Sequence, residues 1–249
     1  PEEALLAVKN IFLSLTKSLI HQQEGSKFMA KSLISVILPV YRGEDYLSEA
    51  IESVLTQSLQ NFEFLICDDG STDSSLSIIR SYSDSRIRLL PQGPHLGLFG
   101  NLNRLAKETK APLIHLFCQD DVMEKKCLQE ELCFFEQHPE IGMSYCKSHQ
   151  IHGDDTVILQ DIIHDLPEVM LPQLSMQHFF YHGCIPSNVS TVCVRKCSLE
   201  EESNFNDDFK VSGDYDLWSR ICSKRPLGVI HQNLVRLRTH PARLSAQLE

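Results

Sequence analysis

From Leu33 onward, the chain alternates between short apolar runs and stretches with helical periodicity. Leu33 to Tyr41 is a nearly continuous apolar and β-branched run, which is typical of a parallel strand covered on both faces. Residues 44–59 then place apolar side chains on one helical face. The same alternation recurs further along the chain, at residues 62–69, 74–82, 86–92, 101–110 and 111–121. Strands and helices in this order favour right-handed crossovers, so the pattern predicts a parallel sheet.

The second half of the chain is less regular. Residues 141–151 and 188–196 have strand patterns, residues 213–222 have a helix pattern, and residues 227–240 form a last strand pattern. The stretch 152–187 is rich in loop signals. We therefore expect an α/β domain over residues 31–249 with an open, mixed, mainly parallel sheet flanked by helices.

A separate helix is expected ahead of this domain. Apolar residues recur at three- and four-residue spacing from Leu5 to Leu19, and Gly25 and Ser26 then interrupt the pattern. We interpret residues 1–30 as an N-terminal amphipathic helix extension outside the catalytic core. Such a helix packs on the main domain, ends a preceding domain, or contacts an oligomer partner or a membrane surface.

Composition limits the partners of the chain. The net charge of −10 argues against a general nucleic-acid binder and against electrostatic docking on anionic lipid. Nine scattered cysteines without a Cys-x-x-Cys pair indicate reduced thiols in a cytosolic protein, with structural zinc as the alternative. No apolar run reaches the length of about 18 residues that a membrane span needs. We expect a cytoplasmic protein that can associate peripherally with the inner face of a membrane.

Two pairs of acids follow predicted strands. Asp68 and Asp69 end one apolar run, and Asp120 and Asp121 end another. Open α/β sheets bind ligands at the carboxyl ends of their strands, and a divalent cation stabilises carboxylates that otherwise repel each other. Turn formation and helix capping are the alternative uses of the same residues.

Four segments, in order, resemble the family 2 glycosyltransferases, which are enzymes of the GT-A fold. They are residues 35–75, the acid motif LFCQDD at 116–121, SGDYDLWSRI at 212–221, and RLRTHPARLS at 236–245. The resemblance covers about residues 32–245. It implies a GT-A-like domain with a nucleotide-binding half at 32–125 and an acceptor-binding half at 126–249.

The resemblance also implies an activity. Members transfer a sugar from a nucleotide sugar, here with a UDP-sugar favoured, to a hydroxyl of a saccharide or lipid-linked acceptor, with inversion. We expect a role in cell-surface polysaccharide or lipopolysaccharide biosynthesis. Asp69 matches the acid that accepts a hydrogen bond from the ring N–H of a pyrimidine base. The residues that match donor-binding positions are Pro39, Val40, Tyr41, Glu44, Asp69, Gly97, Asn103, Asp120 and Arg238. Plain turn roles remain open for Asp69 and Gly97.

By the same resemblance, Asp121 and His240 hold a Mn²⁺ or Mg²⁺ ion, and Asp214 is the general base that takes the proton of the acceptor hydroxyl. Asp214 also suits a helix N-cap, and the two roles are compatible. Two positions depart from the common pattern of the family. Cys118 stands where many members carry an Asp, and Gly213 stands where the motif usually has Glu.

Three other functions are alternatives. A catalytically silent sugar-nucleotide or glycan-binding module would explain the acids lost at Cys118 and Gly213. A glycoside hydrolase also uses two carboxylates but needs no diphosphate site. A nucleotidyltransferase would have a similar order of strands and helices but would lack the GDYDLW motif.

Overall fold

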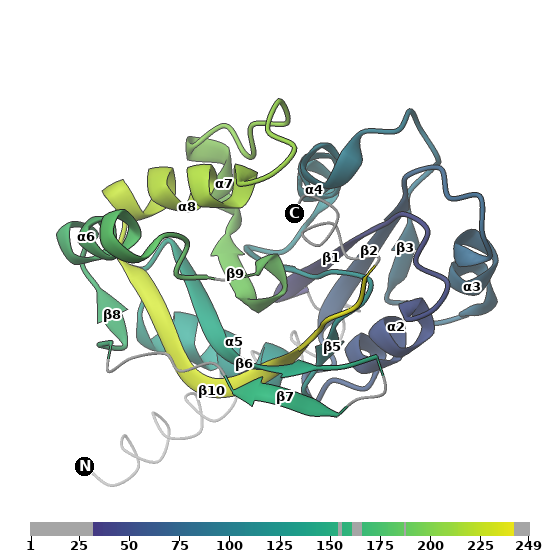
Figure 1. Ribbon diagram of the computed structural model, residues 1–249, viewed down its shortest axis with the longest axis horizontal. Helices are drawn as coiled ribbons and strands as arrows, with labels where there is room; N and C mark the ends of the chain where they lie inside the picture. Colours follow the sequence, from purple (N-terminus) through teal and green to yellow (C-terminus); the bar gives the residue numbers. More distant parts are fainter. Residues whose placement is uncertain (1–31, 154–155, 161–165, 187, 242–249) are drawn as a thin grey trace, which may run out of the picture. The chain divides into compact units, whose positions relative to one another are not determined.

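The computed structural model describes residues 32–153, 156–160, 166–186 and 188–241, and a mixed sheet organises them (Figure 1). Within that part of the chain the sheet has ten strands in the order β3-β2-β1-β4-β9-β6-β10-β5, with β7 on β6 and β8 on β10. The strands are β1 (Ile34–Val40), β2 (Phe62–Asp68), β3 (Ile87–Leu89), β4 (Leu113–Leu116), β5 (Val122–Met123), β6 (Met143–Ile151), β7 (Val157–Gln160), β8 (Val169–Met170), β9 (Val192–Arg195) and β10 (Leu227–Arg238). Strands β3, β2, β1 and β4 are parallel, and β9 joins them antiparallel to β4. The predicted open, mixed α/β sheet is confirmed.

Helices cover both faces of the sheet. They are α2 (Leu47–Leu55), α3 (Ser75–Ser81), α4 (Gly97–Glu108), α5 (Cys127–Gln137), α6 (Pro172–His182), α7 (Lys196–Glu201) and α8 (Gly213–Lys224), with the 3₁₀ turn η1 (Val189–Thr191). In β1, Val36 and Leu38 face α2, α3 and α5, while Ile37 faces the layer of α4, α6, α7 and α8 (Figure 1). Every residue of β1 is buried, which explains why its sequence is apolar throughout instead of alternating.

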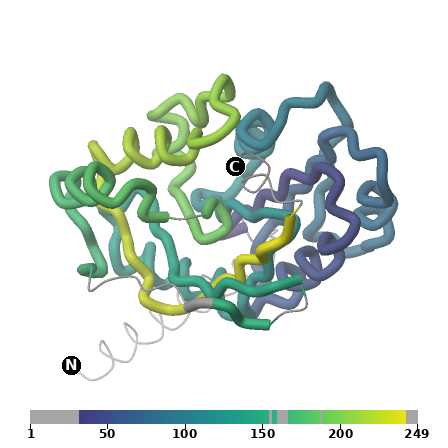
Figure 2. The backbone as a smooth tube through the Cα atoms, viewed as in Figure 1, coloured from purple at the N-terminus to yellow at the C-terminus, as the bar shows by residue number. Residues whose placement is uncertain are grey.

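Strand β10 spans the second half of the sheet. It pairs with β8 near Leu227 and with β5 near Arg236, and it lies parallel to β6 between these ends. Two register shifts, on either side of Asn233, interrupt the β6 pairing. Such irregularities bend a strand, and Figure 2 shows β10, in yellow, curving from the α6 side of the sheet toward α2.

The structure differs from the sequence-based expectations in several elements. Helix α6 lies inside the stretch expected to be loop-rich. A helix after the acid pair was considered only as an alternative, and the structure has α5 there, beginning at Cys127. In α6, Phe179 is buried while Phe180 and Tyr181 are 80% and 75% exposed, so apolar residues surround the helix and hide its periodicity. Strand β4 ends at Leu116, before the acids, and α4 begins at Gly97 instead of Asn101. The helix expected at residues 1–30 lies outside the described residues.

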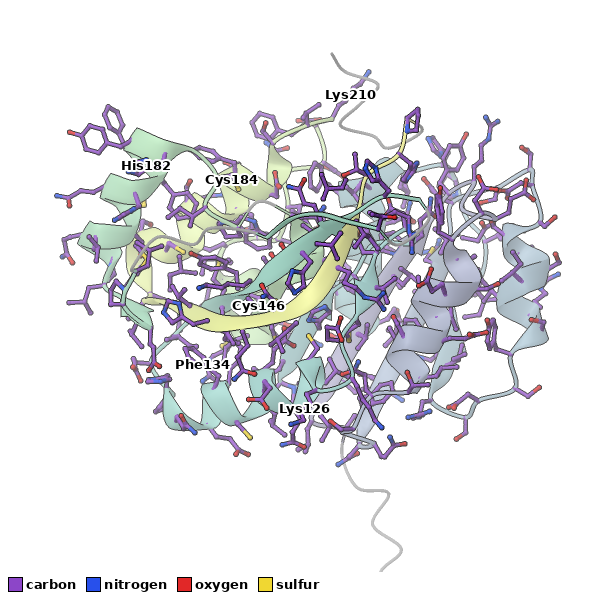
Figure 3. All side chains as sticks on the ribbon, turned by 60° about the horizontal axis from the view of Figure 1, so that its bottom comes forward. Lys126, Phe134, Cys146, His182, Cys184 and Lys210 are labelled. Carbon is purple, nitrogen blue, oxygen red and sulfur yellow. The ribbon has the colours of Figure 1, made fainter. Side chains whose placement is uncertain are left out.

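A polar pair is buried in the core under α5. His115 of β4 and Glu131 of α5 are 0% and 1% exposed, and His115 Nδ1 lies 2.8 Å from Glu131 Oε1. Cys127 and Cys193 adjoin the pair, and burial raises the pKa of both thiols well above its ordinary value. The thiols are therefore protonated and pack as small apolar groups. All nine cysteines are free, as the sequence predicts, and Figure 3 labels Cys146 on the same sheet.

Candidate active site

The end of β1 forms the first wall of the site. Pro39 and Val40 are buried in the strand, and Tyr41, which follows it, is 41% exposed. Gln119 holds the Tyr41 backbone from both sides, because its Oε1 accepts from the Tyr41 N–H at 2.8 Å and its Nε2 donates to the Tyr41 carbonyl at 2.9 Å. The Tyr41 ring lies 4.8 Å from the His95 ring, centroid to centroid. An exposed aromatic ring on a fixed backbone is suited to contact a flat base.

Asp69, directly after β2, organises the loop that leads into α4. Its carboxylate accepts from the backbone N–H of Leu96 at 2.8 Å and of Gly97 at 2.9 Å, and His95 Nδ1 lies 2.8 Å from Oδ2. Gly97 has a φ of +70°, a conformation that favours glycine. The preceding Asp68 has one buried carboxylate oxygen, Oδ1, without a hydrogen-bond partner among the described residues. The base-reading role of Asp69 stays a prediction.

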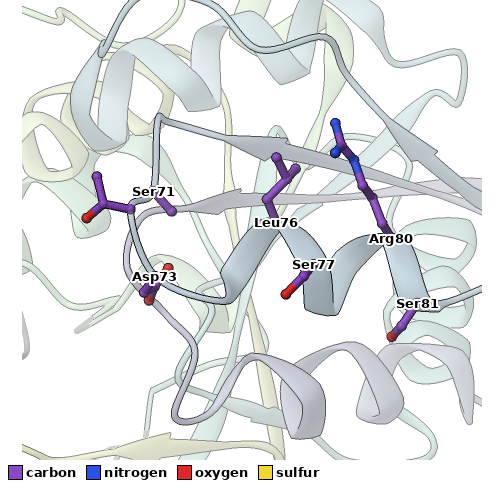
Figure 4. Close-up of a pocket in the computed structure, with 7 residues that line it drawn as sticks. Ser71, Asp73, Leu76, Ser77, Arg80 and Ser81 are labelled. Atoms are coloured by element: carbon purple, nitrogen blue, oxygen red, sulfur yellow. The ribbon is translucent and has the colours of Figure 1, made fainter.

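Glu44 belongs to a turn beside this wall. Its Oε2 accepts from the Ser74 N–H at 2.9 Å, and its own N–H donates to Asp73 Oδ2 at 3.2 Å. Burial acts to raise the pKa of the Asp73 carboxyl, but hydrogen bonds from Ser75 outweigh it and lower the pKa below its ordinary value. A shallow pocket runs from here along α3 (Figure 4), lined by Ser71, Thr72, Asp73, Leu76, Ser77, Arg80 and Ser81. None of the predicted site residues lines this pocket.

The acid pair lies in the connection between β4 and β5. Asp121 is 1% exposed, and its Oδ1 accepts from the Arg238 backbone N–H at 2.9 Å while its Oδ2 accepts from the Ser190 hydroxyl at 2.5 Å. Asp120 is more open, and its Oδ2 lies 3.0 Å from His240 Nε2. The two acids are therefore held by β10 and η1, which come from the second half of the chain. Ligating carboxylates are commonly oriented by such outer hydrogen bonds.

Arg238 ties the end of β10 to the first half of the chain. Its side chain is 1% exposed, and it donates to the carbonyls of Asp120, His152 and Gly153 and, at 2.6 Å, to Glu49 Oε2. The guanidinium carbon also lies 4.7 Å from the centre of the Tyr46 ring. These contacts show that Arg238 supports the acid pair from the protein interior. Its contact with the donor stays a prediction.

Asp214 lies in the first turn of α8, and α8 packs against the start of α4. A Cβ built on Gly213 would lie 2.7 Å from Phe99 Cε2, so the absence of a side chain at 213 allows the two helices to meet. Cys184, which follows α6 and lies beside α8 (Figure 3), has a pKa raised to about 12 by burial and by the nearby Asp214 carboxylate. Asp214 Oδ1 accepts from the Tyr215 N–H at 2.9 Å, which fixes the carboxylate at the start of the helix.

Asn103 of α4 connects the same helix to the loop before α8. Its Nδ2 donates to the Phe205 carbonyl at 2.8 Å, and its Oδ1 accepts from the Phe205 N–H at 2.9 Å. The amide thereby fixes a backbone segment that lies 102 residues further along the chain. Its predicted donor contact stays a prediction.

Sequence reasoning missed four residues that shape the site, namely Gln119, Ser190, His95 and Tyr46. Gln119 and Ser190 hold Tyr41 and Asp121, and Tyr46 lies between Arg238 and His240, whose ring is 5.0 Å from it, centroid to centroid. Only Gln119 had a signal in the sequence, because it directly precedes the acid pair. The other three are brought in by the fold.

The donor set at the acid pair fits a divalent cation. Ligand atoms of Cys118, Asp120 and Asp121 all lie within 4.8 Å of one another. Carboxylate oxygens, with phosphate oxygens from a substrate, are the ligands that Mg²⁺ and Mn²⁺ prefer. The His240 nitrogen adds a further donor close to Asp120. The arrangement therefore fits a divalent cation.

Comparisons with known proteins identify the family of the chain. A family model described as glycosyl transferase family 2 matches residues 35–198. An uncharacterized glycosyltransferase of Rickettsia prowazekii is 26% identical over 218 residues, covering 84% of this chain and 65% of the relative. The Escherichia coli protein WfaP, a UDP-Glc:alpha-D-GlcNAc-diphosphoundecaprenol beta-1,3-glucosyltransferase, is 28% identical over 192 residues, covering 77% of this chain and 71% of that protein.

Solved structures show the same fold. The crystal structure of S. aureus TarS 1-349 in complex with UDP-GlcNAc has a TM-score of 0.70 at 20% identity, covering 86% of this chain and 61% of that one. This chain therefore spans only about three fifths of that structure and 65% of the Rickettsia relative. The family match extends over more than half of the chain, from β1 to α7. The protein belongs to glycosyl transferase family 2 and has the GT-A fold.

Proposed function

We propose that the protein transfers a sugar from a nucleotide sugar, with a UDP-sugar favoured, to a hydroxyl of a saccharide or lipid-linked acceptor, with metal dependence and inversion. One observation carries the proposal. Asp69 holds the start of α4 through Gly97, and Phe99 of the same helix contacts Gly213 beside Asp214. Helix α4 thus connects Asp69, on the side of the donor, with Asp214, which is suited to act as the base.

Each part of the site has a role in this reaction. Tyr41 and Asp69 would bind the base, Asp120 would contact the donor, and Asp121 and His240 would hold Mn²⁺ or Mg²⁺. When bound, the cation neutralises the charge of the departing nucleoside diphosphate. The Asp214 carboxylate would take the proton of the acceptor hydroxyl as the hydroxyl oxygen attacks the anomeric carbon from the face opposite the diphosphate. A single displacement of this kind inverts the configuration at that carbon.

A lipid-linked acceptor is supported by the surface next to Asp214. Residues 169–194 contain no Asp, Glu, Lys or Arg. Within this stretch, α6 exposes Met176, Phe180 and Tyr181 and packs against α8 through the Tyr215 hydroxyl, which donates to the Phe179 carbonyl at 3.1 Å. Uncharged aromatic surface suits the boundary between water and lipid. Among the described residues, no helix is long and apolar enough to cross a bilayer. We therefore propose peripheral contact with a membrane.

The test separates chemistry from donor binding. Asp214→Asn keeps the shape of the side chain and removes its basicity, so single-turnover sugar transfer should fall at least about a hundredfold, while the affinity for UDP-sugar stays within about threefold. Asp216→Asn is the matched control, because Asp216 lies in the same helical turn but pairs with Arg220 at 2.7 Å. If Asp216→Asn loses transfer and Asp214→Asn keeps it, the base has been assigned to the wrong residue.

Nucleotide and metal preferences are tested on the wild-type protein. Calorimetric titration should show UDP binding more tightly than GDP, and excess chelator should abolish transfer. A screen of nucleotide sugars for release of nucleoside diphosphate then identifies the donor. Full turnover in chelator would contradict metal dependence, and preferential binding of GDP would contradict the proposed donor class.

A further inference from the structure

We propose that Cys118 is a third protein ligand of the metal site and shifts its preference from Mg²⁺ toward thiophilic divalent cations. The proposal rests on the proposed function, since it assigns a further ligand to the same cation. It concerns a position where this chain departs from the common acidic pattern of its family. The cysteine that replaces the acid then changes which cations the site prefers, and the site does not lose a ligand.

The geometry places Cys118 with the acid pair. Its Sγ lies within 4.8 Å of ligand atoms of both Asp120 and Asp121, without any change in backbone conformation. Cys118 is half-buried, whereas Cys127 and Cys193 are fully buried in the core. Its sulfur is therefore placed for contact with a bound ion at the site, not deep in the apolar interior.

One hydroxyl fixes Cys118 and Asp121 together. Ser190 Oγ accepts from the Cys118 backbone N–H at 3.0 Å and donates to Asp121 Oδ2 at 2.5 Å. Because the same group orients both residues, their spacing is set by the fold and does not depend on two independent loops. Pre-ordered ligands of this kind lose little conformational freedom when an ion binds.

The alternative use of Cys118 is packing, since it also contacts the apolar cluster on the side of α4 and α8. The two uses predict different behaviour. A packing residue can be replaced by another small residue with no effect on metal choice. A thiolate ligand binds soft and borderline ions such as Cd²⁺ and Zn²⁺ far better than Mg²⁺, which prefers oxygen. On binding, the sulfur–metal bond replaces the S–H bond and the proton goes to solvent, with no change of oxidation state.

The experiment titrates the purified full-length protein with Cd²⁺ alone and with Mg²⁺ alone. Calorimetry gives the affinities, and ultraviolet absorption detects the thiolate-to-Cd²⁺ charge-transfer band. Cys118→Ser should lose that band and bind Cd²⁺ at least about tenfold more weakly, with Mg²⁺ affinity changed less than about threefold. Cys118→Asp should bind Mg²⁺ at least about tenfold more tightly than Cys118→Ser. Cys197→Ser, at an exposed cysteine outside the site, is the matched control and should behave as wild type.

The outcomes separate this proposal from the proposed function. If Cys118→Ser keeps the band and the Cd²⁺ affinity of wild type, Cys118 is a packing residue and the proposal fails, while metal-dependent transfer can stand. If Asp121→Asn leaves both Cd²⁺ and Mg²⁺ binding intact, the cation binds elsewhere, and the proposed metal site fails together with its third ligand. UDP binding measured on the same samples shows that each variant is folded.

Discussion

Adding a side chain at Gly213 should destabilise the domain. The Cβ of Gly213→Ala would lie 2.7 Å and 2.8 Å from Cε2 and Cδ2 of Phe99. That is roughly 1 Å inside the optimal carbon–carbon separation of about 3.5–4.0 Å. Phe99 is 6% exposed, its ring lies 5.3 Å from that of Phe205, and the Phe205 ring lies 5.6 Å from that of Trp218, centroid to centroid in each case. The Phe99 ring therefore cannot move without disturbing two others.

The magnitude follows from two opposing effects. Overpacking a core costs about 1–3 kcal/mol, and replacing Gly by Ala in a helix returns at most about 1 kcal/mol. We expect Gly213→Ala to lower the free energy of unfolding by roughly 1–2 kcal/mol, measured by urea denaturation at unchanged m-value. Because Asp214 is the next residue, sugar transfer should also slow by about tenfold or more, since a misplacement of about 1 Å can cost a hundredfold.

A second variant isolates the contact. Phe99→Leu removes the ring edge that the new Cβ would meet, so Gly213→Ala should cost less in that background than alone. The coupling free energy between the two sites should reach about 1 kcal/mol or more, as for residues in direct contact. Additive effects, or a Gly213→Ala protein as stable and active as wild type, would refute the packing explanation.

Three further perturbations test other parts of the structure. Asp69→Ala should weaken UDP binding by roughly ten- to a hundredfold in calorimetry, because a hydrogen bond to a charged group is worth about 1.5–3 kcal/mol; unchanged affinity would assign Asp69 to the α4 loop alone. His115→Leu should lower the free energy of unfolding by about 1–3 kcal/mol in urea, since it removes the hydrogen-bond partner of the buried Glu131 carboxyl; a loss below about 0.5 kcal/mol would contradict that contribution. Alkylation near neutral pH should label the exposed Cys197 much faster than Cys184, whose pKa of about 12 keeps the thiol protonated up to strongly alkaline pH; mass spectrometry showing equal rates would contradict that environment.

The parallel sheet was predictable because the first half of the chain alternates clearly between apolar strand runs and segments with helical spacing. The apolar, β-branched run of β1 is typical of a strand covered on two faces, and acids that follow parallel strands are expected at the carboxyl edge of the sheet. Family membership followed from four motifs in order. The roles of Asp69, Asp121 and Asp214 in binding and catalysis remain predictions that the experiments above test.

The rest depended on contacts between distant residues. Helix α6 was hidden because Phe180 and Tyr181 face outward and break the apolar periodicity. The supports of the acid pair come from Ser190 and Arg238, which are 69 and 117 residues from Asp121 in the sequence. No local pattern marks a serine in η1 as a partner of an aspartate in another loop. Only the folded topology brings them together.

The continuity of β10 restricts how the length of this chain can change during evolution. At one end of β10, Leu227 pairs with β8, and at the other end the buried Arg238 donates to the Asp120 carbonyl. Deleting one residue between Asn233 and Arg238 would turn every later side chain to the opposite face and move Leu237 to the opposite side of the strand. The existing irregularities around Asn233 are the places where an inserted residue could be absorbed. Insertions and deletions that survive should therefore accumulate in the exposed residues 206–212 before α8 and be rare in the last five residues of β10.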